Sequence, residues 1–273
     1  RDRSPSRGLG DVYKRQPLNR GNSASLFMGW EEQLSFVRDA LGPKLKETGL
    51  KTKIYAFDHN YNYDNMLEQQ GYPMKIYEDE NAASFLTGAA YHNYGGDREE
   101  LNNVNGKFPD KELIFTETSI GMWNDGRNLE KRLMEDMEET ALGTVNNWCK
   151  AVIVWNLMLD NERGPNREGG CQTCYGAVDI DRSDYKTITR NSHYYIIGHL
   201  SSVVKPGAVR IGSKGYTADG IMYSAFENLD GTEALVLLNN TDGTKNITVN
   251  SGERSFTYEV PAKAVASFRW NLY

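Results

Sequence analysis

The chain has 273 residues, of which 39% are hydrophobic and 25% charged, and its formal net charge is −6 at pH 7. This length suffices for one large domain or two ordinary ones, and the composition is that of a globular protein. The acidic balance argues against a nucleic-acid partner. No apolar run approaches the length of a membrane span, so we expect no stable membrane insertion.

The first sixteen residues, RDRSPSRGLGDVYKRQ, have no apolar period and lack the apolar centre of a signal peptide. The stretch DVYKRQ at 11–16 resembles a translated sequencing adapter, and the residues before it continue the same frame. We therefore interpret residues 1–16 as a non-native segment. The natural sequence is then expected to begin near Pro17, inside a longer gene.

The next part of the chain alternates helical and apolar segments. A helical pattern begins at Trp30 and is expected to end at Gly49. Further helical patterns lie near 79–85, at 129–141 and near 188–203. Apolar runs at 52–57, 85–97, 112–117 and 150–158 are expected to be strands. This alternation, with strands that are apolar throughout, predicts a buried parallel sheet built from βαβ units.

Polar or aromatic residues stand where each predicted strand ends. The four ends carry Asp58-His59-Asn60, then His92 with Asn93 and Tyr94, then Glu117, and finally Trp155-Asn156. In a (β/α)₈ barrel the active site lies at the carboxyl ends of the strands. We therefore expect these ends to gather around one site. The alternative is four unrelated surface turns.

After Pro206 the pattern changes to six short strand-like segments separated by turns such as Asp230-Gly231 and Asp242-Gly243. No helical period intervenes, so this part cannot continue an α/β barrel. It predicts an antiparallel β-sandwich domain at 204–273.

A carboxylate at a strand end beside Trp and Tyr suits glycoside hydrolysis. In retaining enzymes one carboxylate attacks the anomeric carbon, while a second one protonates the leaving oxygen. Trp155 offers a flat apolar face to a sugar ring, and Tyr94 can orient Glu117. His92 fits a structural role as well as a sugar contact.

The stretches FTETSIG, GAAYHNYGG and WNLMLDNERGPN resemble glycoside hydrolase family 30, the glucosylceramidase-type enzymes. The resemblance runs from Pro17 to the C-terminus. It implies an α/β fold in which residues 17–203 form the C-terminal half of a (β/α)₈ TIM barrel, followed by the β-sandwich at 204–273. It also implies a retaining hydrolase that cleaves β-glucosidic bonds by double displacement.

The resemblance assigns roles to individual residues. It implies that Glu117 is the nucleophile, that Tyr94 lies beside it and that Trp155 lines the sugar subsite. Asp58, His92 and Asn156 are expected to contribute to substrate binding.

The resemblance also bears on the acid/base residue. In the family this residue is the Glu of an Asn-Glu-Pro motif. Pro17 matches the Pro of that motif, but Gln16 stands where the Glu is expected. Gln16 is the last residue of the segment interpreted as an adapter, so the acid/base Glu is expected to be missing and the chain to be an inactive fragment. It is also expected to aggregate, because a half-barrel leaves a sheet edge open.

The substrate is left open between a glucosylceramide-type lipid and a β-1,6-glucan, and the loop at 164–181 favours a polysaccharide or a free glycoside. A non-catalytic carbohydrate-binding protein is the alternative from another functional class. We expect no cofactor. The full-length protein is expected to be secreted, periplasmic or at the cell surface, and no oligomeric state is assigned.

The remaining motifs are expected to be structural. Cys171 and Cys174 form a CxxC that lacks a second pair and a nearby His, so it indicates a loop disulfide or two thiols rather than a metal site. Asp179 belongs to an acidic segment expected to be a solvated turn. Asn239 and Asn246 begin N-x-T sequons, which matter only in a glycosylating host.

Overall fold

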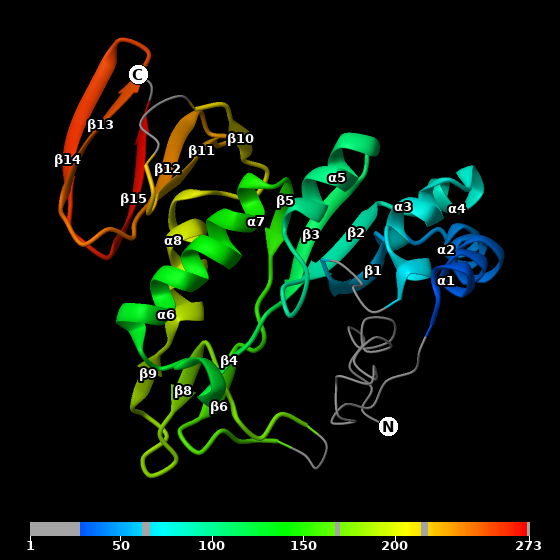
Figure 1. The fold of residues 1–273 in the computed structure, drawn as a ribbon, viewed down its shortest axis with the longest axis horizontal. Helices are drawn as coiled ribbons and strands as arrows, with labels where there is room; N and C mark the ends of the chain where they lie inside the picture. The colour runs from blue at the N-terminus through cyan, green and yellow to red at the C-terminus, as the bar shows by residue number, and fades with distance from the viewer. Residues whose placement is uncertain (1–27, 62–65, 167–169, 214–217, 272–273) are drawn as a thin grey trace. The chain divides into compact units, whose positions relative to one another are not determined.

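The computed structural model describes residues 28–61, 66–166, 170–213 and 218–271 (Figure 1). The segment interpreted as an adapter and the position of Pro17 lie outside these residues. The chain divides into two compact units. The first comprises the described residues of Arg1–Thr118, Asn147–Val154 and Asn166–Gln172, and the second comprises those of Ser119–Asn146, Trp155–Pro165 and Thr173–Tyr273.

The helices of the first unit confirm the predicted helical pattern after Trp30. That run is continuous but contains a π-helical turn, η3, and it ends at Gly49, whose φ of 67° lies in the left-handed region that glycine adopts without strain. The helical elements of this unit are α1 (Trp30–Phe36), η3 (Val37–Leu41), α2 (Gly42–Thr48), η4 (Leu67–Gln69), α3 (Tyr72–Tyr77), α4 (Glu80–Phe85) and α5 (Glu99–Lys107).

A four-stranded parallel sheet forms the centre of the first unit, in the order β1-β2-β3-β5. Its strands are β1 (Tyr55–Asn60), β2 (Gly88–His92), β3 (Glu112–Glu117) and β5 (Cys149–Val152). The sheet confirms the predicted parallel arrangement, and β3 has the predicted bounds. The fourth predicted strand is too long, because β5 ends at Val152 and does not reach Trp155.

The core of the first unit packs the sheet against these helices. Tyr72, Tyr91 and Phe115 are among its largest fully buried side chains. Gly88 is required where β2 begins, because a Cβ atom there would lie 1.8 Å from the backbone oxygen of Glu112 on β3. The two strands therefore start in close contact and run side by side to their carboxyl ends.

The helices of the second unit also follow the predicted pattern, with one correction. Residues 188–190 form a strand, and the last predicted helix begins only at Ser192. Its helical elements are η5 (Met122–Asn124), α6 (Leu129–Asp136), the π-helical turn η6 (Met137–Ala141), α7 (Leu142–Asn146) and α8 (Ser192–Val203).

Two small sheets in the second unit were not predicted. One pairs β4 (Ile120–Gly121) with β7 (Cys174–Tyr175), and the other joins β6 (Met158–Asp160), β8 (Val178–Ile180) and β9 (Ile188–Arg190). These strands are two or three residues long. A run this short shows no period in the sequence, so the whole segment resembles a loop.

The C-terminal strands confirm the predicted antiparallel module. One sheet has the order β10-β11-β12-β15, and β13 pairs with β14. The strands are β10 (Val209–Ile211), β11 (Ile221–Glu227), β12 (Thr232–Asn239), β13 (Lys245–Ser251), β14 (Arg254–Val260) and β15 (Ala264–Asn271). Phe256 on β14 packs against Phe268 and Trp270 on β15, which joins the two layers. Across the described residues, none of the helices has both the length and the apolar character needed to cross a bilayer.

Candidate active site

Two bulged residues shape the carboxyl end of the parallel sheet in the first unit. Asp58 has no partner in the register between β1 and β2, and Thr116 has none in the register between β2 and β3. Asp58 has a φ of 59°, a conformation that few side chains other than Asp and Asn adopt readily. Both bulges re-aim the residues that follow them, and those residues include the predicted site.

Asp58 connects the ends of three strands. Its Oδ1 accepts a hydrogen bond of 2.6 Å from Oγ1 of Thr116 on β3, and it lies 3.1 Å from Nε2 of His92 on β2. The side chain of His92 is buried, whereas that of Asp58 is 23% exposed. The carboxylate therefore fixes the buried ring and still reaches the surface.

Glu117 ends β3 beside this cluster. Its Cα is the register partner of the Cα of His92, and the residue is half-buried. Tyr94 follows β2 and is 45% exposed, with its ring edge-to-face against His92 at 6.0 Å between centroids and 81° between planes. The structure thus brings Asp58, His92, Tyr94 and Glu117 to one end of one sheet, as predicted.

His59 is a further ring at this end of the sheet. It is buried, and its centroid lies 6.4 Å from that of His92 and 5.8 Å from that of Phe57. Its position inside the aromatic layer fits a packing role. His92, in contrast, contacts both the carboxylate of Asp58 and the exposed ring of Tyr94.

Trp155 and Asn156 belong to the second unit and are joined by a cis peptide bond. Trp155 forms a parallel bridge with Ser119, and the backbone oxygen of Asn156 accepts a hydrogen bond of 2.8 Å from Ala177 N. Both side chains are half-buried. Their approach to Glu117 stays a prediction.

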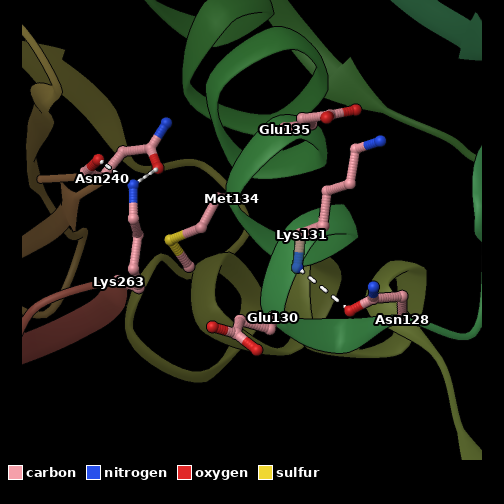
Figure 2. A pocket seen from close by; sticks show the side chains of 7 residues that line it. All are labelled: Asn128, Glu130, Lys131, Met134, Glu135, Asn240 and Lys263. Atoms are coloured by element: carbon pink, nitrogen blue, oxygen red, sulfur yellow. Dashed lines mark hydrogen bonds between the residues drawn. The ribbon is translucent and has the colours of Figure 1, made fainter. Parts of the chain in front are cut away.

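A separate pocket of about 320 Å³ lies in the second unit (Figure 2). It contains none of the predicted site residues and no aromatic side chain. Its lining consists of Asn128, Glu130, Lys131, Met134, Glu135, Asn240 and Lys263. Without an apolar ring face it does not suit a sugar ring.

Comparison with protein families identifies the chain. Residues 5–204 match the model of the glycosyl hydrolase family 30 TIM-barrel domain, and residues 207–268 match that of the family 30 beta sandwich domain. The chain belongs to glycoside hydrolase family 30. The first match begins inside the segment interpreted as an adapter.

Individual relatives of this family 30 chain fall into two groups. An endo-1,6-beta-D-glucanase of Trichoderma harzianum is 29% identical in an alignment of 271 positions that covers 94% of this chain and 50% of that protein. The lysosomal acid glucosylceramidase of Mus musculus is 22% identical over 91% of this chain and 50% of that protein. The chain spans about half the length of these curated relatives.

A solved structure gives a stronger likeness. The endo-beta1,6-glucanase BT3312 superposes with a TM-score of 0.91 at 72% sequence identity, over 94% of this chain and 56% of that one. SrfJ from Salmonella typhimurium superposes with a TM-score of 0.79 at 27% identity, over 91% of this chain and 54% of that one. Both support the barrel and sandwich architecture.

The structure adds one residue that sequence analysis missed, Thr116, and corrects one expectation, that for Asp179. Thr116 was missed because a bulge has no local sequence signature. Asp179 was expected in a solvated turn, but it is buried and its Oδ2 accepts hydrogen bonds of 2.9 Å from Arg127 and from Asn191. Its place inside β8 gives it these partners, which the acidic composition of the segment does not reveal.

The cysteines are resolved as follows. Cys171 and Cys174 are disulfide-bonded, which settles the two alternatives left by the sequence. Cys149 is a free, buried thiol on β5, and burial raises its pKa above the ordinary value. A buried thiol with a raised pKa is a poor nucleophile, so Cys149 is not a candidate for a catalytic role.

Proposed function

We propose that this family 30 chain carries the nucleophile half of a retaining glycosidase that cleaves β-1,6-linked glucan. The observation that carries the proposal is the register pairing of Glu117 with His92, which Asp58 holds in place. The 72% identity to a structure named as an endo-beta1,6-glucanase supports the polysaccharide as substrate.

The chemistry follows from the chain's own residues. Glu117 attacks the anomeric carbon of a β-glucoside, the bond to the leaving oxygen breaks, and an α-linked glycosyl ester forms. Water then attacks the same carbon and releases Glu117. Asp58, His92 and Tyr94 hold the sugar hydroxyls at the sheet end, because they offer a carboxylate, a ring nitrogen and an exposed phenol beside Glu117. Trp155 supplies an apolar face for a sugar ring.

The second carboxylate of a retaining pair protonates the leaving oxygen. Gln16 stands at the position where the sequence predicts that residue, and it lies outside the described residues. Gln16 also belongs to the segment interpreted as non-native, and its carboxamide is no carboxylic acid that could donate the proton. We therefore expect the chain to hydrolyse glycosides slowly unless the leaving group departs without a proton.

An activated donor tests the nucleophile without the acid. A 2-deoxy-2-fluoro β-glucoside with a dinitrophenolate leaving group should label the full chain, because dinitrophenolate leaves unprotonated. Mass spectrometry of the digested protein should find one adduct on the peptide that contains Glu117. Glu117→Gln should abolish the adduct, and the control Glu80→Gln, an exposed residue at the start of α4, should retain it.

Two outcomes count against the proposal. An adduct that persists in Glu117→Gln moves the nucleophile to another residue. The absence of any adduct on the unmodified chain shows that this chain does not by itself hold a competent site. Rapid hydrolysis of an unactivated aryl β-glucoside would instead contradict the assignment of a missing acid.

Glucosylceramide is the second candidate substrate, since relatives of the chain include glucosylceramidases. A binding comparison separates the two. Calorimetry with a β-1,6-linked gluco-oligosaccharide should show saturable binding, and glucosylceramide in detergent should show none. Binding of the lipid alone would reverse the assignment.

A further inference from the structure

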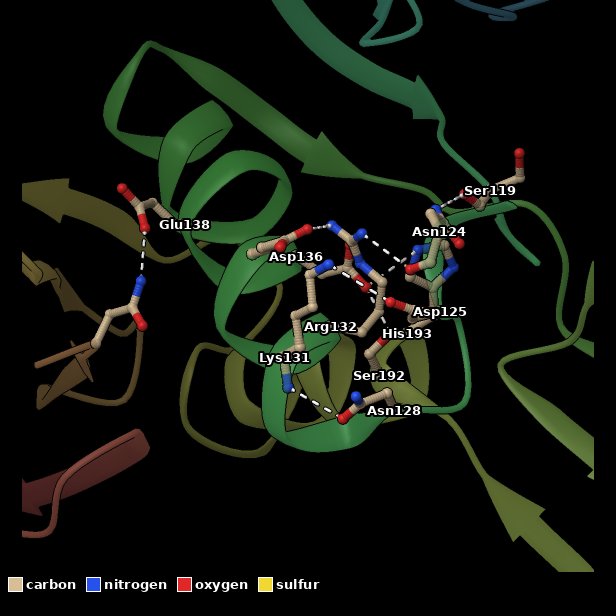
Figure 3. Close-up of polar contacts among 12 residues, drawn as sticks. Ser119, Asn124, Asp125, Asn128, Lys131, Arg132, Asp136, Glu138, Ser192 and His193 are labelled. Carbon is tan, nitrogen blue, oxygen red and sulfur yellow. Dashed lines mark hydrogen bonds and ion pairs between the residues drawn. The ribbon is translucent and has the colours of Figure 1, made fainter. Parts of the chain in front are cut away.

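A buried polar cluster in the second unit connects helices α6 and α8 to the segment that contains Trp155. Its central members are Arg132, Asp136 and Ser192 (Figure 3). We propose that these three are positioning residues that fix the indole of Trp155 for sugar binding. The inference rests on the proposed function, in which Trp155 faces a sugar ring.

The first connection runs from Trp155 through Ser119. These two residues form a parallel bridge. The backbone oxygen of Ser119 accepts a hydrogen bond of 3.3 Å from Nδ2 of Asn124, whose Oδ1 accepts one of 2.9 Å from Gly121 N. The side chain of Asn124 therefore closes the turn from Ser119 to Asn124, and this turn holds the backbone that pairs with Trp155.

Arg132 on α6 contacts the turn that ends at Asn124. Its Nη1 donates a hydrogen bond of 3.3 Å to the backbone oxygen of Asn124, and its Nε donates one of 2.9 Å to Oδ1 of Asp136. Figure 3 shows the guanidinium between Asp136 and Asn124. One planar side chain thus joins the helix to the turn, with donors in fixed directions.

Asp136 carries the connection from α6 to α8. The residue is buried, and its Oδ2 accepts a hydrogen bond of 2.5 Å from Oγ of Ser192, the first residue of α8. Nε2 of His193 lies 3.8 Å from the same oxygen. A carboxylate shared between two helices fixes the start of α8 relative to α6.

The start of α8 leads back to Trp155 by a second route. The backbone nitrogen of Asn191 donates a hydrogen bond of 2.9 Å to Ala177 O, and Ala177 N donates one of 2.8 Å to Asn156 O. Burial lowers the pKa of the His193 ring, and the backbone of Trp155 acts in the opposite direction. These contacts therefore form a closed series that begins at Trp155, passes through α6 and α8, and returns to Asn156.

This closed series of polar contacts exceeds what is needed to hold the two helices together. α6 and α8 contact each other, and each carries a buried apolar side chain, Met134 on α6 and Ile196 on α8, so the polar members are not the only groups that these helices bury. Arg132, Asp136 and Ser192 are each hydrogen-bonded, and a bonded network of polar groups inside a protein helps to specify one arrangement of the backbone. The arrangement specified here is that of the residues before and after the indole.

Fluorine NMR of the full chain labelled with 5-fluorotryptophan tests this role. The chain has five tryptophans, so single Trp→Phe variants assign each signal. Ser192→Ala removes the hydroxyl that bonds Asp136, and it should shift and broaden the Trp155 signal. Trp30 and Trp148 lie in the first unit, and their signals should not move. Ser192→Thr keeps the hydroxyl and should restore the Trp155 signal.

A second variant, Asn124→Ala, tests the same role in case Ser192→Ala disturbs the fold. Asn124 is only half-buried, so Asn124→Ala should leave the helices intact, as far-UV circular dichroism will show. It breaks the turn beside Ser119 and should displace the same Trp155 signal. A Trp155 signal that stays at its wild-type position in folded Asn124→Ala and in Ser192→Ala overturns the proposal.

Titration with a β-1,6-linked gluco-oligosaccharide connects the cluster to binding. The Trp155 signal of the wild-type chain should shift on saturation, and Ser192→Ala should weaken the apparent affinity about tenfold through misplacement of the ring. A wild-type Trp155 signal that ignores the sugar contradicts the proposed function. The ligand-free spectra then still decide whether the cluster positions Trp155, so the two failures are distinguishable.

Discussion

Thr116 and Asp58 are the bulged residues of two strands that do not pair with each other, and they are joined by a hydrogen bond of 2.6 Å across the end of β2. The bond fixes the position of the carboxylate that lies against His92. It therefore connects the register of the sheet to the geometry around Glu117. A substitution that removes the Thr116 hydroxyl, which also lies 3.4 Å from the backbone oxygen of Tyr91, should affect the site more than the fold.

Thr116→Val tests that expectation, because it replaces the hydroxyl with a methyl group of the same shape. We expect the loss of about 1 kcal/mol of unfolding free energy, the usual size for one hydrogen bond. The rate of covalent labelling at Glu117 should fall about tenfold, since the site depends on close positioning. Thr116→Ser keeps the hydroxyl and should label at the wild-type rate. Equal labelling rates for the Val and Ser variants would show that this bond has no part in the site.

The sequence predicts the strands of the parallel sheet because their apolar runs are continuous. It also predicts that Asp58, His92 and Glu117 meet, since parallel strands end at the same edge of a sheet. The two bulges, at Asp58 and Thr116, could not be predicted from the sequence. A bulge depends on how two strands pair, and residues far apart in the chain decide that pairing.

The second unit shows a different limit. The six strands of the C-terminal module are predictable, because apolar segments alternate there with turn residues such as Gly231, whose φ is 78°. The short strands β6 to β9 are not, and neither is the cluster around Asp136. Its hydrogen-bonded partners Asp136 and Ser192 lie 56 residues apart in the sequence, so only the folded backbone brings them together.

Glu112 predicts a pH effect at the opposite end of the sheet. Hydrogen bonds from Tyr55 and Lys53, together with Lys150, lower its pKa to about 2 from the ordinary value of 4.5. The folded state therefore favours the carboxylate. Its stabilising contribution is complete above pH 4.5 and is lost as the pH falls from there toward 2.

Glu112→Gln isolates this contribution. Because both lysines are exposed, we expect the variant to be only about 1 kcal/mol less stable than the wild type at neutral pH. Urea unfolding at pH 7, 4.5 and 3 should show this difference shrinking as the pH falls. A difference that stays constant down to pH 3 would exclude a lowered pKa as its cause.

Asn239 predicts a contrast between the two sequons. Its buried Nδ2 donates to the backbone oxygens of Gly243, Val260 and Pro261 at 2.9, 3.2 and 2.8 Å. Asn239→Ala leaves these buried groups without their partner and should cost about 2–4 kcal/mol. Asn246 is exposed on β13, and Asn246→Ala should change stability by less than about 0.5 kcal/mol. Thermal unfolding measures both, and similar losses in the two variants would contradict the assigned role of Asn239.

The same two residues differ as acceptors of a glycan. The side-chain nitrogen of Asn239 is fully engaged inside the module, whereas that of Asn246 faces solvent. In a host that glycosylates secreted proteins, peptide mapping should find a glycan on Asn246 and none on Asn239. A glycan on Asn239 would mean that the β12–β13 turn opens before the module folds.

The buried ring of His193 should make the second unit less stable as the pH falls. Burial and the nearby Arg132 cation lower its pKa to about 4 from 6.5, so folding favours the neutral ring. This contribution is complete above pH 6.5 and is lost as the pH falls from 6.5 to 4, which amounts to about 3 kcal/mol for a group so deeply buried. Asp136 faces the ring, and because burial raises the pKa of its carboxyl group, its contribution to stability changes with pH in the opposite direction.

His193→Gln leaves Asp136 and Arg132 in place, so urea unfolding at pH 7, 5.5 and 4.5 should show a weaker loss of stability on acidification than in the wild type. If the two proteins lose stability in parallel over this range, the ring is already accessible to protons in the folded state.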